Sequence, residues 1–349
     1  MGYPTLTYQC DDQIATIALT VPAPLFFRTT LACFWLLAFS SATHDIAADG
    51  FYLLALPADQ QAAFVGVRNT CYRLAMIAGQ GGLVYLAGVL QQPLGGIKVA
   101  WAGAFLLLAV IFVFAALYHL AALPRPPADQ PARAARRPAA DYFSVFATFF
   151  QKKEIKVIVG FLLLYRLGEA QLLKLVTPFL LDARAVGGLG LSTQEVGLLY
   201  GTLGITALIL GGLVGGYAIY RFGLKRLLWP MLVSMHLPLA VFVVLAVRQP
   251  AGLAWIGGAL MVEQFGYGFG FTAYMVYMMM VTEGRYRTAH YAICTGIMAL
   301  GMMLPGLPAG WIQDHLGYER FFIWVCLATI PSFVATALIK VDPAYGRRA

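Results

Sequence analysis

The sequence predicts an all-α integral membrane protein with about nine transmembrane helices. Of its 349 residues, 60% are apolar and only 11% are Asp, Glu, Lys or Arg, whereas soluble domains carry about 25% charged residues. The mean hydropathy is +0.74, and nine segments approach the ~20 apolar residues that a helix needs to cross a bilayer. This composition excludes a disordered, fibrous or nucleic-acid-binding protein.

The predicted spans divide the chain into four parts. Residues 1–29 form an irregular N-terminal segment, because prolines, aspartates and an arginine interrupt its apolar runs and leave no core for a signal peptide. Residues 30–123 hold three spans as a partial N-terminal half, residues 124–156 form a polar linker, and residues 157–349 hold six spans as the C-terminal half. The spans are 30–56, 66–90, 99–123, 157–181, 196–220, 227–247, 253–281, 288–312 and 320–340.

The linker has two parts of different composition. It begins with PRPPADQPARAARRP, which is typical of a flexible connection. Its end, DYFSVFATFFQKKE, fits either an amphipathic helix on the membrane surface or a solvated linker. With this linker in the cytoplasm, sixteen Lys and Arg residues lie on the cytoplasmic side and five on the other. The positive-inside rule therefore predicts a cytoplasmic linker and C-terminus, and the bias explains the pI of about 9.3.

A weak internal repeat relates the first three spans to the last three at a shift of about 226 residues. In both, a long span is followed by a short polar loop and by a span rich in small residues. Six spans after a long basic cytoplasmic loop are typical of the second half of a 6+6 transporter. Because only three spans precede the loop, we expect the chain to correspond to helices 4–12 of such a fold.

Four motifs carry a resemblance to a known family. The segments FWLLAFSSATHDIAADGFYLLAL and LLLYRLGEAQLLKLVTPFLLD resemble the fourth and seventh helices of the AmpG-type permeases of the major facilitator superfamily. GGYAIYRFGLKR is similar to the superfamily's cytoplasmic loop motif, and GWIQDHLGYERFF to the loop that enters the last helix. His44 replaces the usual Gln, Tyr220 replaces the loop Asp, and the opening helices are absent. The loop motif maps to Gly216, Arg221, Gly223, Lys225 and Arg226.

Four acidic residues within the spans are candidates for proton coupling, because a charge at the bilayer centre is costly. Asp45 and Asp49 stand four residues apart on one helical face, where each can raise the other's proton affinity; alternatively, Asp49 already lies in headgroup water. Glu169 can pair with Arg166 three residues before it, either within a coupling site or as a neutral packing pair. Glu263 is an acid deep in an apolar run with no evident local partner.

Five further polar residues are candidates for binding the solute. Arg166 and Gln264 adjoin acidic residues in two of the spans, and Lys174 lies on a different face from Glu169. Arg73 could reach Asp45 or Asp49 from the next span. His44 is either a proton partner or a substituted amide.

No pattern indicates covalent or metal chemistry. The five cysteines show no CxxC or Cys/His spacing, and neither nucleotide-binding nor hydrolase motifs occur. We therefore expect no enzyme activity, catalytic residue, cofactor or metal.

The resemblance implies a proton-coupled importer of anhydro-muropeptides that works by alternating access. A related cargo such as acetyl-CoA, and a truncated fragment that does not transport, are the alternatives. The implied setting is the bacterial inner membrane. The expected partners are a small-molecule solute, protons and lipid, with no nucleic acid, and we expect a monomer.

Overall fold

The computed structural model describes residues 23–91, 93, 96–124, 126 and 138–348. Helices and short connections make up these described residues, and no strand occurs among them, which confirms the all-α class. Residues 1–22 of the predicted N-terminal segment and the Pro-rich part of the linker lie outside the described residues. The first helix begins at Ala23, before the predicted span, because Pro24 is tolerated in the first turn of a helix.

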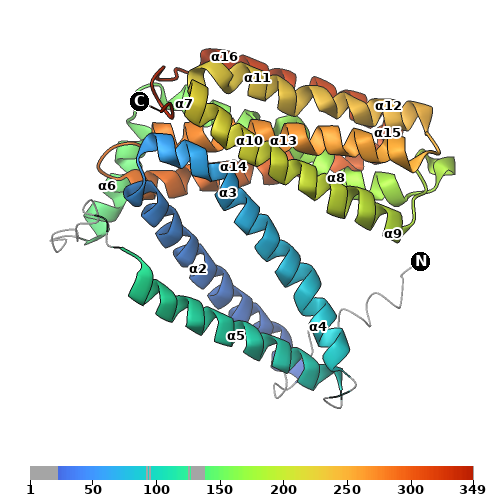
Figure 1. The fold of residues 1–349 in the computed structure, drawn as a ribbon, viewed down its shortest axis with the longest axis horizontal. Coiled ribbons are helices and arrows are strands. Elements are labelled where there is room, and N and C mark those ends of the chain that lie inside the picture. The colour runs from blue at the N-terminus through green and yellow to red at the C-terminus, as the bar shows by residue number, and fades with distance from the viewer. Residues whose placement is uncertain (1–22, 92, 94–95, 125, 127–137, 349) are drawn as a thin grey trace. The chain divides into compact units, whose positions relative to one another are not determined.

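The described residues form two compact units, drawn in Figure 1. The first unit comprises the described parts of Met1–Ala48 and Cys71–Asp129. It holds most of α2 and the end of α3, together with a π-helix and two further helices that pack on each other. These elements are α2 (Ala23–Ala55), α3 (Ala58–Ile77), η1 (Ala78–Gly82), α4 (Leu83–Leu90) and α5 (Ile97–Ala122).

The second unit comprises Asp49–Thr70 and the described residues from Gln130 onward. The ends of α2 and α3 that meet at their connecting loop therefore belong to it. Its other elements are α6 (Pro138–Phe150), α7 (Ile155–Leu164), α8 (Leu167–Leu181), η2 (Arg184–Val186), α9 (Thr193–Val196), η3 (Gly197–Gly204), α10 (Ile205–Phe222), α11 (Leu224–His236), η4 (Leu237–Leu239), α12 (Ala240–Arg248), α13 (Leu253–Val281), α14 (Arg287–Gly306), α15 (Ala309–Leu327) and α16 (Ile330–Leu338).

Six helical segments among the described residues are long and apolar enough to cross a membrane. They correspond to six of the nine predicted spans: Phe27–Ala55, Val99–Ala122, Thr193–Phe222, Leu224–Arg248, Arg287–Gly306 and Ala309–Leu338. The other three predicted spans are also helical, as α3–η1–α4, α7–α8 and α13. Charged residues in the first two, and the Glu263–Gln264 pair in α13, make these segments less apolar.

The last two predicted spans are divided differently by the structure. A helical path continues from α14 into the first part of α15, and it is broken at Gly317, whose φ of 72° is non-helical. Glycine adopts this left-handed conformation without the steric cost that a side chain would add. The break therefore lies within the predicted connection between spans 288–312 and 320–340.

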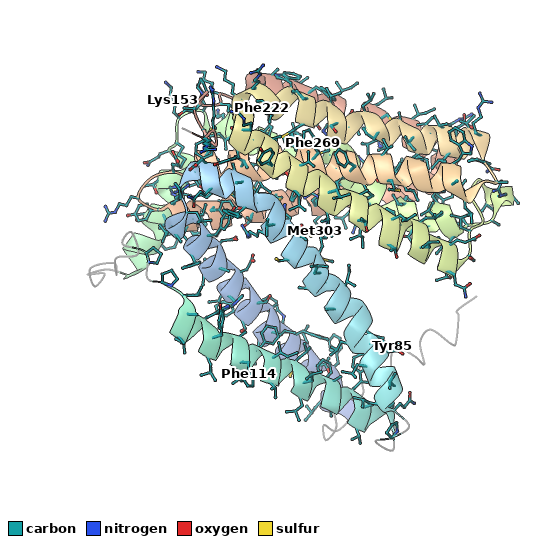
Figure 2. The ribbon with its side chains drawn as sticks, in the orientation of Figure 1. Tyr85, Phe114, Lys153, Phe222, Phe269 and Met303 are labelled. Atoms are coloured by element: carbon teal, nitrogen blue, oxygen red, sulfur yellow. The ribbon has the colours of Figure 1, made fainter. Side chains whose placement is uncertain are left out.

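Large apolar side chains cover the outer surfaces of the helices. Tyr85 on α4 is 76% exposed and Phe114 on α5 is 71% exposed, and both are labelled in Figure 2. Soluble monomers rarely expose such extended apolar surface. Together with the six apolar helices, this surface identifies a multi-pass membrane protein.

Helix α13 is the central helix of the second unit and packs on α10, α11 and α14. Glycines bring α13 and α10 close together, because a Cβ added at Gly268 would lie 2.1 Å from the Leu208 carbonyl oxygen. The reciprocal approach occurs at Gly211, where a Cβ would lie 2.2 Å from the Phe265 carbonyl oxygen. Small residues that allow close backbone contact are the usual means of packing helices in membranes.

One pair of helix ends matches the shift of the predicted internal repeat, whereas α3 (Ala58–Ile77) and α14 (Arg287–Gly306) are offset by 229 residues. Helix α2 ends at Ala55 and α13 ends at Val281, which is the same interval as the 226 residues that separate Gln61 from Arg287. At the predicted shift of about 226 residues Gln61 aligns with Arg287, and the two side chains are hydrogen-bonded to each other at 2.9 Å.

Candidate functional site

The predicted seventh span is a broken helix. Two residues separate α7 from α8, and the second, Arg166, has φ −110° and ψ 19°. Side chains from other helices bond to carbonyls before the break. The Tyr274 hydroxyl donates to the Leu162 oxygen at 2.7 Å, and Ser332 Oγ donates to the Leu164 oxygen at 2.7 Å. Breaks of this kind persist in membranes where neighbouring groups satisfy the backbone, and broken helices form the solute sites of many transporters.

Arg166 forms a compact polar cluster at the break. Its Nε and Nη2 donate to the two carboxylate oxygens of Glu169 at 2.9 and 2.8 Å, and Nη2 also donates to the Tyr267 hydroxyl at 2.7 Å. The guanidinium carbon lies 4.6 Å from the ring centre of Phe271. Only 9% of the Arg166 side chain and 2% of the Glu169 side chain are exposed. The pair thus carries no net charge while Glu169 is ionised, and each carboxylate oxygen accepts a hydrogen bond from the guanidinium.

A second polar cluster lies on α13. Glu263 and Gln264 are both buried, and the Gln264 amide donates to Glu263 Oε2 at 2.9 Å. The same amide nitrogen lies 3.4 Å from the hydroxyl of Tyr200 in the π-helix η3. The expectation that Glu263 has no local partner was therefore wrong, because its neighbour in sequence turns its amide back onto the carboxylate. π-Helical turns are frequent at functional sites.

The two aspartates of α2 have different surroundings. Asp49 is buried and forms an ion pair with Arg68 of α3, and the Arg68 guanidinium also lies over the Tyr52 ring at 5.4 Å. Asp45, one turn earlier on the same helix, is exposed. The reading of Asp49 as a residue already in headgroup water does not fit its burial and its ion pair.

Two other candidates from the first three spans lie in the first unit. His44 is exposed on α2, and Arg73 is half-buried on α3. The sequence reasoning considered Arg73 as a partner for Asp49. The ion pair found among the described residues is instead made by Arg68, which lies closer to the α2–α3 loop. Five residues along a helix correspond to about 7.5 Å of rise, so the two arginines occupy different depths.

Arg287 at the start of α14 binds the loop end of the α2–α3 hairpin. Its guanidinium donates to Gln61 Oε1 at 2.9 Å and to the Leu53 carbonyl at 3.1 Å. The Gln61 amide in turn donates to the carbonyls of Leu53 and Leu56. Nearby, burial raises the pKa of Tyr345 to about 12, against the opposing effect of Arg287. The Tyr345 hydroxyl is therefore protonated at neutral pH.

The glycines of the predicted cytoplasmic motif have structural roles. Gly216 on α10 packs against α3, where an added Cβ would lie 2.9 Å from the carbonyl oxygens of Ala62 and Ala63. Gly223 joins α10 to α11 with a φ of 84°. The cations of the motif, Arg221, Lys225 and Arg226, are exposed.

Lys174 on α8 does not join the Arg166 cluster. Its side chain passes over Gly306 of α14, where an added Cβ would lie 3.0 Å from Lys174 Cε. Its amine end is exposed. This position agrees with the prediction that Lys174 lies on a different face from Glu169.

Comparison with known proteins identifies the relatives of this chain. No family model matches it. It is 27% identical over 311 residues to the anhydromuropeptide permease of Escherichia coli strain K12, a match that covers 89% of this chain and 60% of that protein. It is 24% identical to a putative AmpG 2 transporter of Rickettsia typhi, covering 88% of this chain and 71% of the relative. The chain is a homologue of the AmpG-type permeases.

This relationship agrees with the resemblance read from the motifs. The chain spans only 60% of the length of the Escherichia coli relative. The relatives are named as permeases or transporters. These names confirm the expectation that the chain is not an enzyme. A protein of Haemophilus influenzae with no named function is 27% identical over 306 residues.

Sequence reasoning missed the partners of two candidate residues, Arg166 and Asp49. Tyr267 contacts Arg166 from α13, about one hundred residues away in sequence, and no local pattern marks it. Arg68 was counted only as a cytoplasmic cation. A short loop joins the helix of Asp49 to the helix of Arg68, so the two helices run antiparallel and Arg68 passes close to Asp49. This spacing could have predicted the ion pair.

Proposed function

We propose that this chain acts in proton-coupled import of anhydro-muropeptides across the bacterial inner membrane, as a transporter of the major facilitator type. Its C-terminus would lie in the cytoplasm, as the charge bias predicts. The observation that carries the proposal is the buried Arg166–Glu169 pair at the break of the seventh span. The name of the Escherichia coli relative supplies the solute class, and the repeat supports the major facilitator architecture.

The Arg166–Glu169 pair offers a simple coupling mechanism. While Glu169 is ionised, it occupies Arg166 through two hydrogen bonds. Protonation of Glu169 removes its charge, and Arg166 then becomes available for another anion. The peptide part of an anhydro-muropeptide ends in carboxylates, which match the forked guanidinium of arginine. Proton and solute would therefore bind together. Loss of the proton from Glu169 to the cytoplasm would restore its pairing with Arg166 and release the solute.

The remaining candidates have supporting roles in this proposal. Glu263 with Gln264 would form a second protonation site, and Asp49 with Arg68 would be a third, nearer the cytoplasm. Asp45, His44, Arg73 and Lys174 stay candidates for contact with the solute.

Uptake of a radiolabelled anhydro-muropeptide into cells that lack their own permease tests the proposal. Uptake should depend on an inward proton gradient. Glu169→Gln should abolish gradient-driven uptake but retain exchange of labelled for unlabelled solute, because exchange needs no net proton movement. Glu283→Gln is the matched control, since this glutamate is 54% exposed in the connection between α13 and α14 and its substitution should leave uptake unchanged.

Two results would overturn parts of the proposal. No uptake by a chain that is inserted in the membrane would favour the fragment that does not transport. Full gradient-driven uptake by Glu169→Gln would remove Glu169 from the coupling step. Uptake of labelled acetyl-CoA by the chain, without uptake of labelled anhydro-muropeptide, would identify acetyl-CoA as the transported solute instead.

A further inference from the structure

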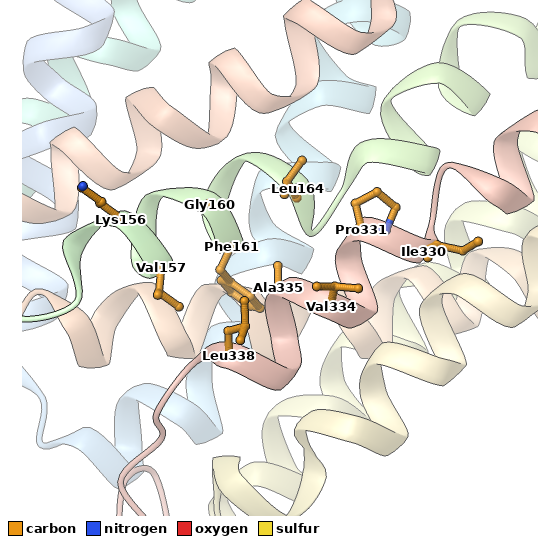
Figure 3. A pocket seen from close by; sticks show the side chains of 10 residues that line it. All are labelled: Lys156, Val157, Gly160, Phe161, Leu164, Ile330, Pro331, Val334, Ala335 and Leu338. Carbon is orange, nitrogen blue, oxygen red and sulfur yellow. The ribbon is translucent and has the colours of Figure 1, made fainter.

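A long apolar groove runs between α7 and α16 on the second unit, with a volume of about 470 Å³. This volume is in the range of pockets that hold small molecules, about 300–1,000 Å³. The α16 wall is a stripe of Ile330, Val334 and Leu338, which are 55%, 56% and 60% exposed. Figure 3 shows the groove with Lys156 at one end and Ile330 at the other. The groove is therefore open on the surface that the membrane covers.

The α7 wall explains why the surface is hollow there. Lys156, Gly160 and Leu164 are spaced four residues apart, and all three line the groove, so they lie on one face of the helix. A Cβ added at Gly160 would meet nothing within 4 Å. Because Gly160 has no side chain, the groove stays open along α7 from Lys156, near the helix start, to Leu164, beside the break of the seventh span.

A second hollow of about 270 Å³ lies near the lysine end of the groove. Val157 lines both hollows, so they are neighbours at the start of α7. Lys153, Lys340 and Glu154 line the second hollow, and Glu154 is paired with Lys340. Lys156 lines the groove itself, so the two hollows together carry three lysines and one carboxylate, a net positive charge.

We propose that this groove binds an anionic glycerophospholipid. One acyl chain would lie along the apolar stripe, and the phosphate would lie at Lys153 and Lys156. Basic pockets between transmembrane helices on the cytoplasmic side are typical sites for anionic headgroups, and each lysine near the surface contributes about fivefold in affinity. The lysines lie on the side that the linker and the charge bias assign to the cytoplasm.

The site adjoins the broken helix. Ser332 on α16 bonds to the last carbonyl of α7, and its neighbour Pro331 lines the groove. An acyl chain seated between α7 and α16 would therefore contact α7, which ends at the break, and α16, whose Ser332 bonds to the last carbonyl of α7. The lipid would stabilise this junction without touching the Arg166–Glu169 pair.

Native mass spectrometry of the full chain tests the proposal. The protein in detergent is titrated with phosphatidylglycerol or with phosphatidylethanolamine of the same acyl chains. We expect one saturable phosphatidylglycerol adduct that binds more tightly than the phosphatidylethanolamine adduct. Gly160→Leu fills the groove and should abolish this adduct. Gly258→Leu, at an exposed glycine of α13 that also has open space around it, is the matched control and should retain it.

Charge variants keep the test decisive if Gly160→Leu fails to fold. Lys153→Gln combined with Lys156→Gln should weaken phosphatidylglycerol binding about 25-fold and bring it close to phosphatidylethanolamine. Lys225→Gln combined with Arg226→Gln removes two exposed cations elsewhere and should change it little. Equal binding of both lipids by the wild type, or unchanged binding by the Lys153/Lys156 variant, would overturn the proposal.

Discussion

The substitution Gly268→Ala tests the close packing of α10 and α13. The new Cβ would lie 2.1 Å from the Leu208 carbonyl oxygen, whereas ordinary contact begins at 3.4 Å. The obstacle is backbone on a neighbouring helix, so no side chain can rotate away. The two helices must separate by about 1 Å at this point, and overpacking of this kind costs about 1–3 kcal/mol.

Gly258→Ala on the same helix supplies the control. This position is exposed, and an added Cβ there would meet nothing within 4 Å. Both substitutions gain the same helix propensity, about 1 kcal/mol for replacing glycine by alanine. The propensity effect therefore cancels when the two variants are compared, and the difference reports the steric cost alone.

The assay is reversible unfolding of the purified protein in mixed micelles, followed by circular dichroism. Gly268→Ala should be less stable than Gly258→Ala by about 1–3 kcal/mol. Equal free energies of unfolding for the two variants would refute the close approach of α10 and α13.

Three further predictions concern the polar contacts. Arg166→Met should lower the free energy of unfolding by about 3–5 kcal/mol, because it leaves Glu169 buried and unpaired; adding Glu169→Gln should restore part of the loss, and strict additivity in this cycle would contradict the pairing. Asp49→Asn should cost about 1–3 kcal/mol, because the partly exposed Arg68 loses an ionic acceptor; unchanged thermal stability would argue against that ion pair. Ser332→Ala should cost about 1 kcal/mol and speed hydrogen exchange at the break of the seventh span, and equal exchange rates would show that the serine does not support it.

The helices were predictable from sequence because membrane spans must be long and apolar. All nine predicted segments are largely helical. Three of them, α3–η1–α4, α7–α8 and α13, are less apolar than the other six. The pairing of Arg166 with Glu169 was also within reach, because residues three apart on a helix are neighbours. Both results depend on the local sequence only.

The break at Arg166 could not be predicted in the same way. The sequence around it contains no proline, and the break is stabilised by the hydroxyls of Tyr274 and Ser332, which come from remote helices. The partner of Asp49 was missed for a related reason. Choosing between Arg68 and Arg73 requires the height of each arginine along α3 relative to α2, and this depends on where the hairpin turns.

The hydrogen bond between Gln61 and Arg287 has a consequence for how such a protein can arise. In an assembly of two identical halves, a residue beside the two-fold axis meets its own copy, so both partners would be arginine or both would be glutamine. Two arginines would repel each other. Once duplicated halves are joined in one gene, each copy can diverge separately, and a donor can face an acceptor. Under the 226-residue alignment, this contact places two different residues at one repeat position, which a fused chain allows and two identical halves do not.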